Sequence, residues 1–244
     1  MNQKRIFIGT SGFSYPEWKG SFYPKELSPK KYLPFYAERF HTTEINNTFY
    51  RIPTAKNMEE WYAAVPADFS FTLKLNQNIT HRKRLKEAGQ DMERFLNAAA
   101  SLKEKLGTIL VQLPPYFKAD LPLLEDFLSA YSKKARLAFE FRHDTWLVED
   151  VYQLLRNHNC ALGVVEAEDR PAVKLLTADF VYLRLRKGDY NKEELAVWAE
   201  WIHNQKVDVY CYLKHDEKAP LLAQQLLDLL QIDSADKANL SIGL

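Results

Sequence analysis

The sequence predicts a single closed (β/α)8 barrel of the TIM type, and two observations carry this prediction. Eight short segments of strand composition alternate with helical segments along 244 residues, a length that a barrel uses as one domain. The chain has only 8 glycines and no GxGxxG or phosphate-binding loop, whereas an open doubly wound sheet usually has a glycine-rich first turn. We therefore favour the closed barrel over the open sheet.

The predicted strands are short runs rich in β-branched and aromatic residues. In chain order they span residues 5–9, 42–48, 70–74, 108–113, 137–141, 161–166, 180–185 and 207–213. Strands that alternate with helices in this way favour a parallel sheet. We expect residues 1–232 to form the barrel and residues 233–244, which lack apolar periodicity, to form a C-terminal tail.

Between the strands, apolar residues recur at the i, i+3, i+4, i+7 spacing of amphipathic helices. The apolar faces are, in order, Leu33, Tyr36, Ala37, Phe40; Met58, Trp61, Tyr62, Val65; Phe95, Leu96, Ala99, Leu102, Leu106; Leu124, Phe127, Leu128, Tyr131; Leu147, Val151, Leu154, Leu155; Leu195, Trp198, Ala199, Ile202; and Leu222, Leu226, Leu229. Pro34 falls inside the first helix, so we expect a kink or a late helix start there. The sixth connection, around residues 171–176, has room for only a turn or two of helix.

Composition narrows the classes of partner and compartment. The net charge of +1 gives no overall attraction to nucleic acid or membranes, although local patches are compatible with it. No stretch approaches the roughly 20 apolar residues of a membrane span, and the apolar run in MNQKRIFIGTSG is too short for a signal peptide. Cys160 and Cys211 are isolated, as expected for buried thiols in a reducing compartment. We expect a cytoplasmic protein without membrane contact, and the sequence leaves its oligomeric state open.

Polar residues occupy one side of several predicted strands. In AFEFRH, Glu140 and Arg142 share one side while Phe139 and Phe141 share the other. The same alternation marks EINNTF, FTLKLN, ILVQLPP, VYLRLR and VYCYLKH. Strand residues of a barrel alternate between the interior and the helix layer, and the apolar set suits the helix layer. The polar set should therefore point inward, toward the C-terminal mouth where barrel active sites lie.

This inward set predicts an anion-binding pocket. The carboxylates of Glu44 and Glu140 are outnumbered by cations, which favours a small phosphate- or carboxylate-containing ligand, and nucleic acid is a second candidate. Glu140 is the first choice for a catalytic carboxylate, acting as a base, and Glu44 is the second. The candidate ligand-binding residues are Lys74, Arg142, Arg184, Arg186, Lys214, Asn46, Gln112, Tyr182, Tyr212, His143 and Trp18.

Structural interpretations compete with this one. The charges would also fit a salt-bridge network inside the barrel, in which Glu140 only neutralises Arg142. The aromatic loop around Trp18 would either pack as a lid over the barrel end or offer stacking surfaces. The basic run at residues 80–86 is a solvated surface or a phosphate clamp.

A metal site is the weaker alternative. His81, His143 and His215 follow predicted strands and would lie near Glu44, Glu140, Glu166 and Asp216. No HxxxH or HxH spacing supports such a site, so we predict neither a metal nor another cofactor.

Five motifs resemble those of the YecE-like family, also called domain of unknown function 72. They are IGTSGFSYPEWKGSFYP, EINNTFYR, QLPP, EFRH followed by Trp146, and YLRLRKGDY, and they run in order through nearly the whole chain. The resemblance implies a TIM-type barrel and no settled activity. The family's structural likeness to endonuclease IV-type barrels makes nucleic-acid processing a candidate by analogy alone.

Two positions depart from the family pattern. Asn47 stands where EINSTFYR has serine, and Arg186 ends the seventh strand where a histidine often stands. The change to Arg186 weakens a shared metal or acid-base site and strengthens the anion-binding interpretation. Three function classes stay open: an enzyme, such as a hydrolase, acting on a small anionic substrate, a metal-dependent nuclease or phosphodiesterase, and a non-catalytic binding protein.

Overall fold

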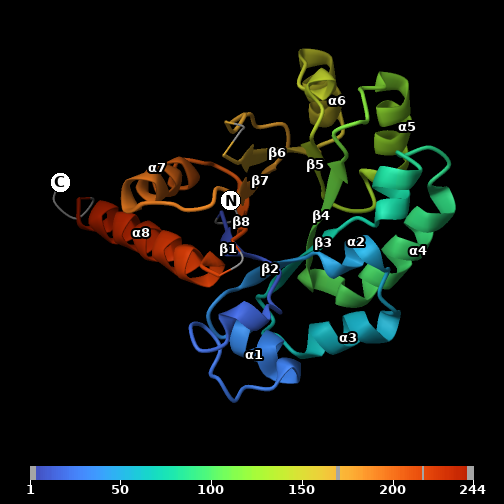
Figure 1. Cartoon of the computed structure of the whole chain (residues 1–244). Coiled ribbons are helices and arrows are strands. Elements are labelled where there is room, and N and C mark those ends of the chain that lie inside the picture. The colour runs from blue at the N-terminus through green and yellow to red at the C-terminus, as the bar shows by residue number, and fades with distance from the viewer. Residues whose placement is uncertain (1–3, 169–170, 216, 241–244) are drawn as a thin grey trace.

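Eight parallel strands pair in chain order and close into a barrel, so the predicted fold class is confirmed (Figure 1). The computed structural model describes residues 4–168, 171–215 and 217–240. The strands are β1 (Ile6–Ser11), β2 (Thr42–Ile45), β3 (Ser70–Lys74), β4 (Leu106–Leu113), β5 (Leu137–Phe141), β6 (Ala161–Glu166), β7 (Phe180–Leu185) and β8 (Asp208–Leu213). Every predicted strand is present, and the differences lie at the strand ends.

The largest strand difference falls in EINNTFYR. The strand β2 ends at Ile45, and the following residues form a one-turn helix, α2 (Asn47–Tyr50). Asn46 has helical dihedral angles, and the Thr48 hydroxyl donates to the Ile45 carbonyl, which turns the chain away from the barrel wall. The amide-rich half of this motif therefore forms a turn at the barrel mouth rather than the end of a strand.

Within the described residues, seven longer helices surround the barrel (Figure 1). They are α1 (Tyr32–Ala37), α3 (Ala55–Ala63), α4 (Gly89–Ala99), α5 (Leu121–Tyr131), α6 (Glu149–Asn157), α7 (Lys192–His203) and α8 (Ala219–Leu240). Each corresponds to one predicted apolar face. Side-chain caps fix several N-termini, as where the Asn191 side chain accepts from the Glu194 backbone N–H and Glu194 returns the bond.

We expected either a kink or a late start of the first helix at Pro34, and the structure shows the late start. A 3-10 turn, η2 (Pro29–Lys31), precedes α1, which begins at Tyr32. Pro34 is the third residue of α1, where backbone N–H groups have no intrahelical partner, so its missing N–H removes no hydrogen bond.

The connection from β6 to β7 contains no helix within its described residues, 167–168 and 171–179. The chain there is held by Thr177, whose hydroxyl donates to the Cys160 carbonyl and accepts from the Leu162 N–H. Residues 171–177 have no regular secondary structure in place of the turn or two of helix for which this segment has room.

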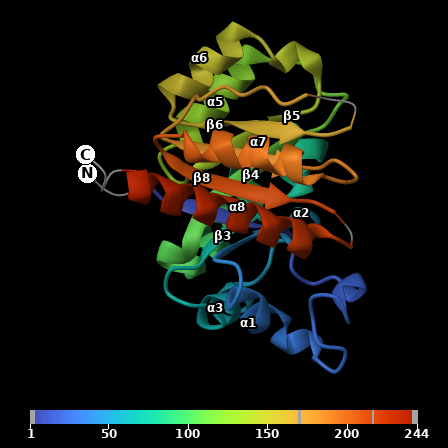
Figure 2. The ribbon, with the colours of Figure 1, turned by 90° about the vertical axis from the view of Figure 1, so that its left-hand side faces the viewer.

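The last helix, α8, lies beside α7 against the outside of β1 and β8 (Figure 2). It continues to Leu240, into the segment that we expected to form a tail, and the domain boundary at residue 232 stays a prediction. Among the residues described, no helix combines the length and the apolar character needed to cross a bilayer.

The barrel interior is layered along the strands. Apolar and aromatic side chains such as Phe7, Leu110 and Phe180 fill its N-terminal end. Above them lies a layer of hydroxyls, in which the Tyr212 hydroxyl bonds Thr42 at 2.8 Å and Thr72 at 2.7 Å. The C-terminal layer is charged and is described below. The alternate strand residues pack with the helices, as predicted.

Gly9 marks a close approach of two strands. A Cβ at this position would lie 2.1 Å from the Thr42 carbonyl oxygen, so Gly9→Ala would push β1 away from β2. We expect the substitution to lower the free energy of unfolding by about 1–3 kcal/mol or more, the usual scale of overpacking in a core. Denaturant unfolding of the purified variant measures this loss.

The matched control is Gly89→Ala at the start of α4. There the nearest atom to a new Cβ is the Tyr131 hydroxyl at 3.7 Å, an ordinary contact distance. Alanine is the better helix former, so this variant should be as stable as the parent or more stable by up to about 1 kcal/mol. Equal destabilisation of both variants would contradict the assigned contact between β1 and β2.

Candidate functional site

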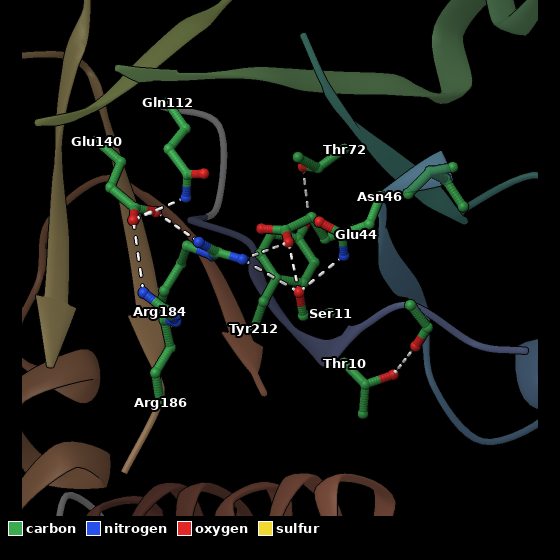
Figure 3. Close-up of polar contacts among 12 residues, drawn as sticks. Thr10, Ser11, Glu44, Asn46, Thr72, Gln112, Glu140, Arg184, Arg186 and Tyr212 are labelled. Carbon is green, nitrogen blue, oxygen red and sulfur yellow. Dashed lines mark hydrogen bonds and ion pairs between the residues drawn. The ribbon is translucent and has the colours of Figure 1, made fainter. Parts of the chain in front are cut away.

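A buried guanidinium, that of Arg184 on β7, bridges two carboxylates at the C-terminal end of the barrel (Figure 3). Its Nη1 donates to Glu140 Oε2 at 2.5 Å, and its Nη2 donates to Glu44 Oε1 at 2.8 Å. Nη2 also lies 3.2 Å from the Ser11 hydroxyl. Arg184 and both glutamates are buried, so we name these three side chains the ion cluster. Their pairing offsets the large cost of burying each charge alone.

The strand register places the neighbours of the ion cluster. Ser11 on β1 stands opposite Glu44 on β2, and its hydroxyl donates to Glu44 Oε1 at 2.5 Å. Gln112 on β4 stands opposite Glu140 on β5, and its Nε2 donates to Glu140 Oε1 at 2.8 Å. In both pairs, residues matched across adjacent strands also bond through their side chains, so the closed barrel aligns the cluster.

The Glu44 carboxylate is ionised despite its burial. Burial alone would raise its pKa, but the Arg184 charge and hydrogen bonds from Ser11 and Tyr182 outweigh that effect. Its pKa is therefore held below the ordinary glutamate value. The Tyr182 hydroxyl donates to Glu44 Oε2 at 2.5 Å, so the polar contacts of this carboxylate favour the charged form against the effect of burial.

The ionised form of the Glu140 carboxylate is favoured still more strongly than that of Glu44. Burial opposes its ionisation, but Arg184, then Arg142 and Arg186, lower its pKa far below the ordinary value. Arg142 Nε lies 3.1 Å and Arg186 Nη1 lies 3.6 Å from Glu140 Oε1. The expected Glu140–Arg142 pair is thus present, but it is one of three guanidinium contacts and the Arg184 contact is the shortest.

Two of the predicted ligand-binding residues lie beneath the ion cluster. Tyr182 and Tyr212 are fully buried, and their hydroxyls bond to Glu44 and to the threonines of the hydroxyl layer. They form the floor of the site, and Tyr182 supports the Glu44 carboxylate from below.

Arg142 and Arg186 lie on the mouth side of Glu140. Their side chains keep 34% and 23% of their surface exposed, so both guanidinium groups can meet a ligand from solution. They border a cavity of about 340 Å³. Its lining residues are Pro115, Glu140, Phe141, Arg142, Val165, Ala167 and Arg186.

Lys74, at the end of β3, occupies another part of the mouth. Its amine lies 4.2 Å from the centre of the Phe49 ring. Burial and the nearby Arg184 charge lower its pKa to about 8, against the opposing pull of Glu44 and Glu140. His81 also contacts the Phe49 ring, with ring centres 4.8 Å apart, and burial, Lys74 and Arg142 lower its pKa to about 4.

The four other predicted ligand-binding residues have mixed positions. Asn46 follows β2 and donates to the Ser11 hydroxyl at 2.9 Å. Lys214 is exposed after β8, and half-buried His143 accepts from the Thr145 N–H. Trp18 differs from the expected stacking surface, because it is fully buried among aromatic side chains of its own loop that pack against α1.

The proposed metal ligands do not converge in the described part of the chain, where no group of three or more His, Cys, Asp or Glu side chains is arranged to hold a metal ion. Glu166 instead accepts from the Trp198 indole at 2.9 Å, on the helix side of β6. Asp216 lies outside the described residues.

The basic run at residues 80–86 follows β3, and its first residues belong to a helical turn, η3 (Asn78–Arg82). Arg82, Lys83, Arg84 and Lys86 are exposed, and Lys83 pairs with Asp91 at 2.9 Å. Arg84, Leu85 and Glu87 have φ values of 50°, 68° and 46°, a left-handed backbone that non-glycine residues seldom adopt. The charged side chains of this run are therefore solvated, and its backbone is locally strained.

Ser11 and Phe49 were not identified as site residues from the sequence. Ser11 bonds Glu44, Asn46 and Arg184, and Phe49 packs against both Lys74 and His81. The sequence did contain a sign of the position of Ser11. It follows Phe7 and Gly9 at steps of two along the first strand, so its side chain points to the same side as theirs, the inside of a barrel. Phe49 gave no such signal because it lies on the helical turn of α2.

The fold and site define a TIM-barrel protein with a buried Arg–Glu cluster at the end where barrel enzymes hold their active sites. The model of the family described as "Protein of unknown function DUF72" matches residues 7–241. The chain belongs to this DUF72 family, which confirms the resemblance drawn from its motifs.

Relatives agree with this assignment. The UPF0759 protein YunF of Bacillus subtilis (strain 168) is 29% identical over 197 residues, covering 77% of this chain and 67% of that protein. A DUF72 family protein of Thermotoga maritima MSB8 superposes with a TM-score of 0.80 at 29% identity, over 93% of this chain and 99% of that one. One from Enterococcus faecalis V583, at 21% identity and a TM-score of 0.76, covers 93% of this chain and 95% of its own and supports the fold alone.

Removing the Glu140 charge tests the ion cluster. Glu140→Gln leaves Arg142 and Arg186 beside a neutral amide and takes one of two carboxylates from Arg184. We expect the free energy of unfolding at pH 7 to fall by about 3–5 kcal/mol, the scale for breaking a buried pair. Chemical denaturation of both proteins measures the difference.

The pH dependence of that difference follows from the lowered pKa of Glu140. A group with a depressed folded pKa stabilises the fold above its unfolded pKa, about 4.3 for glutamate, and loses this contribution as the pH falls toward the folded value. The gap between parent and variant should therefore be full above about pH 5 and shrink in more acidic buffer. Glu149→Gln, which breaks a surface pair with Arg156, is the control and should change stability by less than about 1 kcal/mol. A gap that widens on acidification would contradict the assignment.

Proposed function

We propose that this protein binds a small anionic ligand, with a phosphate or carboxylate group, at the C-terminal mouth of its barrel. The carrying observation is a charge imbalance: the ion cluster and its rim hold Lys74, Arg142, Arg184 and Arg186 against the carboxylates of Glu44 and Glu140. Among the described residues of this site the cations outnumber the carboxylates by two, and an anion bound there would neutralise that excess.

Arg142 and Arg186 are the residues that we assign to the anion. Both border the 340 Å³ cavity, and a guanidinium group holds carboxylate or phosphate oxygens with two parallel bonds. The Arg186 Nε is buried and has no hydrogen-bond partner within the described residues. A ligand oxygen in the cavity is a suitable partner for such a group, because an unpaired buried donor is costly.

Glu140 is assigned to positioning these guanidinium groups. A carboxylate held ionised by three guanidinium groups is a weak proton acceptor, because its pKa lies far below neutral pH. This favours anion binding over the hypothesis that Glu140 acts as a general base. If turnover is found, Glu140→Gln should lower it by reducing the fraction of folded, ligand-competent protein.

A thermal-shift titration tests anion binding, with inorganic phosphate, phosphosugars, nucleotides and short oligonucleotides, each with and without divalent metal ions. A ligand at about one hundred times its Kd stabilises the fold by about 2.7 kcal/mol, which corresponds to a rise in Tm of roughly 5 °C or more for a chain of this size. Stabilisation by oligonucleotides that depends on a metal ion would instead favour the nuclease or phosphodiesterase hypothesis.

Substitutions of the two arginines test where the anion binds. Arg142→Ala and Arg186→Ala should each weaken binding by about tenfold to a hundredfold, since one charged hydrogen-bonding group contributes about 1.5–3 kcal/mol. Arg156→Ala on α6, whose guanidinium pairs with Glu149 on the surface, is the control and should leave affinity unchanged. The proposal is refuted if none of the anions raises the Tm, or if all three substitutions weaken binding equally.

A further inference from the structure

Lys74 is a lysine without a polar partner in a site full of charges. Within the described part of the chain, no hydrogen bond or ion pair reaches its amine, which lies 4.2 Å from the centre of the Phe49 ring. The Lys74 side chain is half-buried, and Phe49, from the turn after β2, lies against it. Packing therefore holds the amine in place, and its N–H groups donate to no acceptor among the described residues.

The charges around Lys74 explain why it has no partner. Glu44 on β2 and Glu140 on β5 attract it, but both carboxylates are already bonded to Arg184. Arg142 on β5 and Arg184 on β7 repel it, and His81 in the loop after β3 faces it. Burial and these cations lower the pKa of the amine to about 8. An amine with that pKa has about a hundredfold more of its neutral form at pH 7 than an ordinary lysine.

We propose that Lys74 is a nucleophilic amine that forms a Schiff base with an aldehyde or ketone carrying an anionic group. This inference rests on the proposed anion site, because Arg142 and Arg186 would hold the anionic group of the same molecule. The position of Lys74 at the C-terminal end of a barrel strand is where barrels present groups that react with a ligand. A desolvated lysine beside other cations is one of the recognised ways to activate an amine.

The step balances without an oxidant or reductant. The neutral Lys74 amine attacks the carbonyl carbon, the C–N bond forms, and a proton passes from nitrogen to oxygen to give a carbinolamine. The carbinolamine hydroxyl then takes up a proton and leaves as water while the C=N bond forms. The His81 imidazole, with a pKa of about 4, is uncharged at pH 7 and adds no further positive charge near the amine.

Reductive trapping tests this directly on the full-length protein. Pyridoxal 5′-phosphate serves as a phosphorylated aldehyde and glyoxylate as a small carboxylated one, each with sodium cyanoborohydride, followed by intact mass and peptide mapping. We expect modification at Lys74 at least about tenfold above any other lysine near pH 7. The rate should rise between about pH 6 and pH 9 with a midpoint near 8, where ordinary lysines still increase toward about 10.4.

Three comparisons separate nucleophilic chemistry from simple charge attraction. Lys74→Arg keeps the positive charge and should lose the adduct, and Lys74→Met should lose it as well, with folding of both checked by circular dichroism. Lys118→Arg, at an exposed lysine following β4, should leave the adduct intact. An uncharged aldehyde such as propanal should react with Lys74 about tenfold more slowly, because it lacks the group that Arg142 and Arg186 would bind.

The outcomes distinguish this inference from the anion site on which it rests. Protection of Lys74 by inorganic phosphate supports both. A phosphate-dependent rise in Tm that Arg186→Ala abolishes, with no preferred adduct at Lys74, would keep the anion site and overturn the Schiff-base inference. Trapping at Lys74 that phosphate does not slow would support the nucleophile and overturn the anion site. Adducts spread evenly over surface lysines, or an unchanged adduct yield in Lys74→Arg, would overturn the inference.

Discussion

The guanidinium of Arg184, buried between the carboxylates of Glu44 and Glu140, is the interaction on which the upper half of the barrel depends. Three charges of this kind are stable out of water only when each has its partners in place, because an unpaired buried charge costs several kcal/mol. The requirement ties together strands β2, β5 and β7, which do not all neighbour one another in the wall. The ion cluster therefore connects these three strands through the barrel interior.

The layer below the ion cluster supplies a further hydrogen bond to it. The hydroxyl of Tyr182 bonds Glu44 from below, and the hydroxyl of Tyr212 joins the threonines of β2 and β3. Below these lie side chains such as Phe7 and Phe180, which need no polar partners. The polarity of the barrel interior thus rises along the strands from the N-terminal to the C-terminal end, so that the interior charges lie at the C-terminal mouth.

At that mouth the charged residues divide into two kinds. Arg184 bonds carboxylates through both terminal nitrogens and serves the fold, whereas Arg142 and Arg186 are partly exposed and Lys74 has no polar partner in the described chain. Both kinds arise from one arrangement, since the carboxylates that hold Arg184 cannot also neutralise every cation around them. The proposed anion binding and the proposed reactivity of Lys74 are consequences of this shortage of negative charge.

The sequence by itself determined the barrel and the inward-facing residues. Alternation with a period of two assigns Glu140, Arg184 and Tyr212 to one side of their strands, and a closed barrel has only one interior for that side to face. Only the tertiary structure decided which side chains form ion pairs with one another. Glu140 was matched by proximity along the chain to Arg142, but its shortest contact is with Arg184, 44 residues away, because β5 and β7 flank β6 and both point these side chains into the barrel. Ser11, Phe49 and the burial of Trp18 likewise depend on strand register and loop packing, which involve residues far apart in sequence and leave no periodic signal in any one segment.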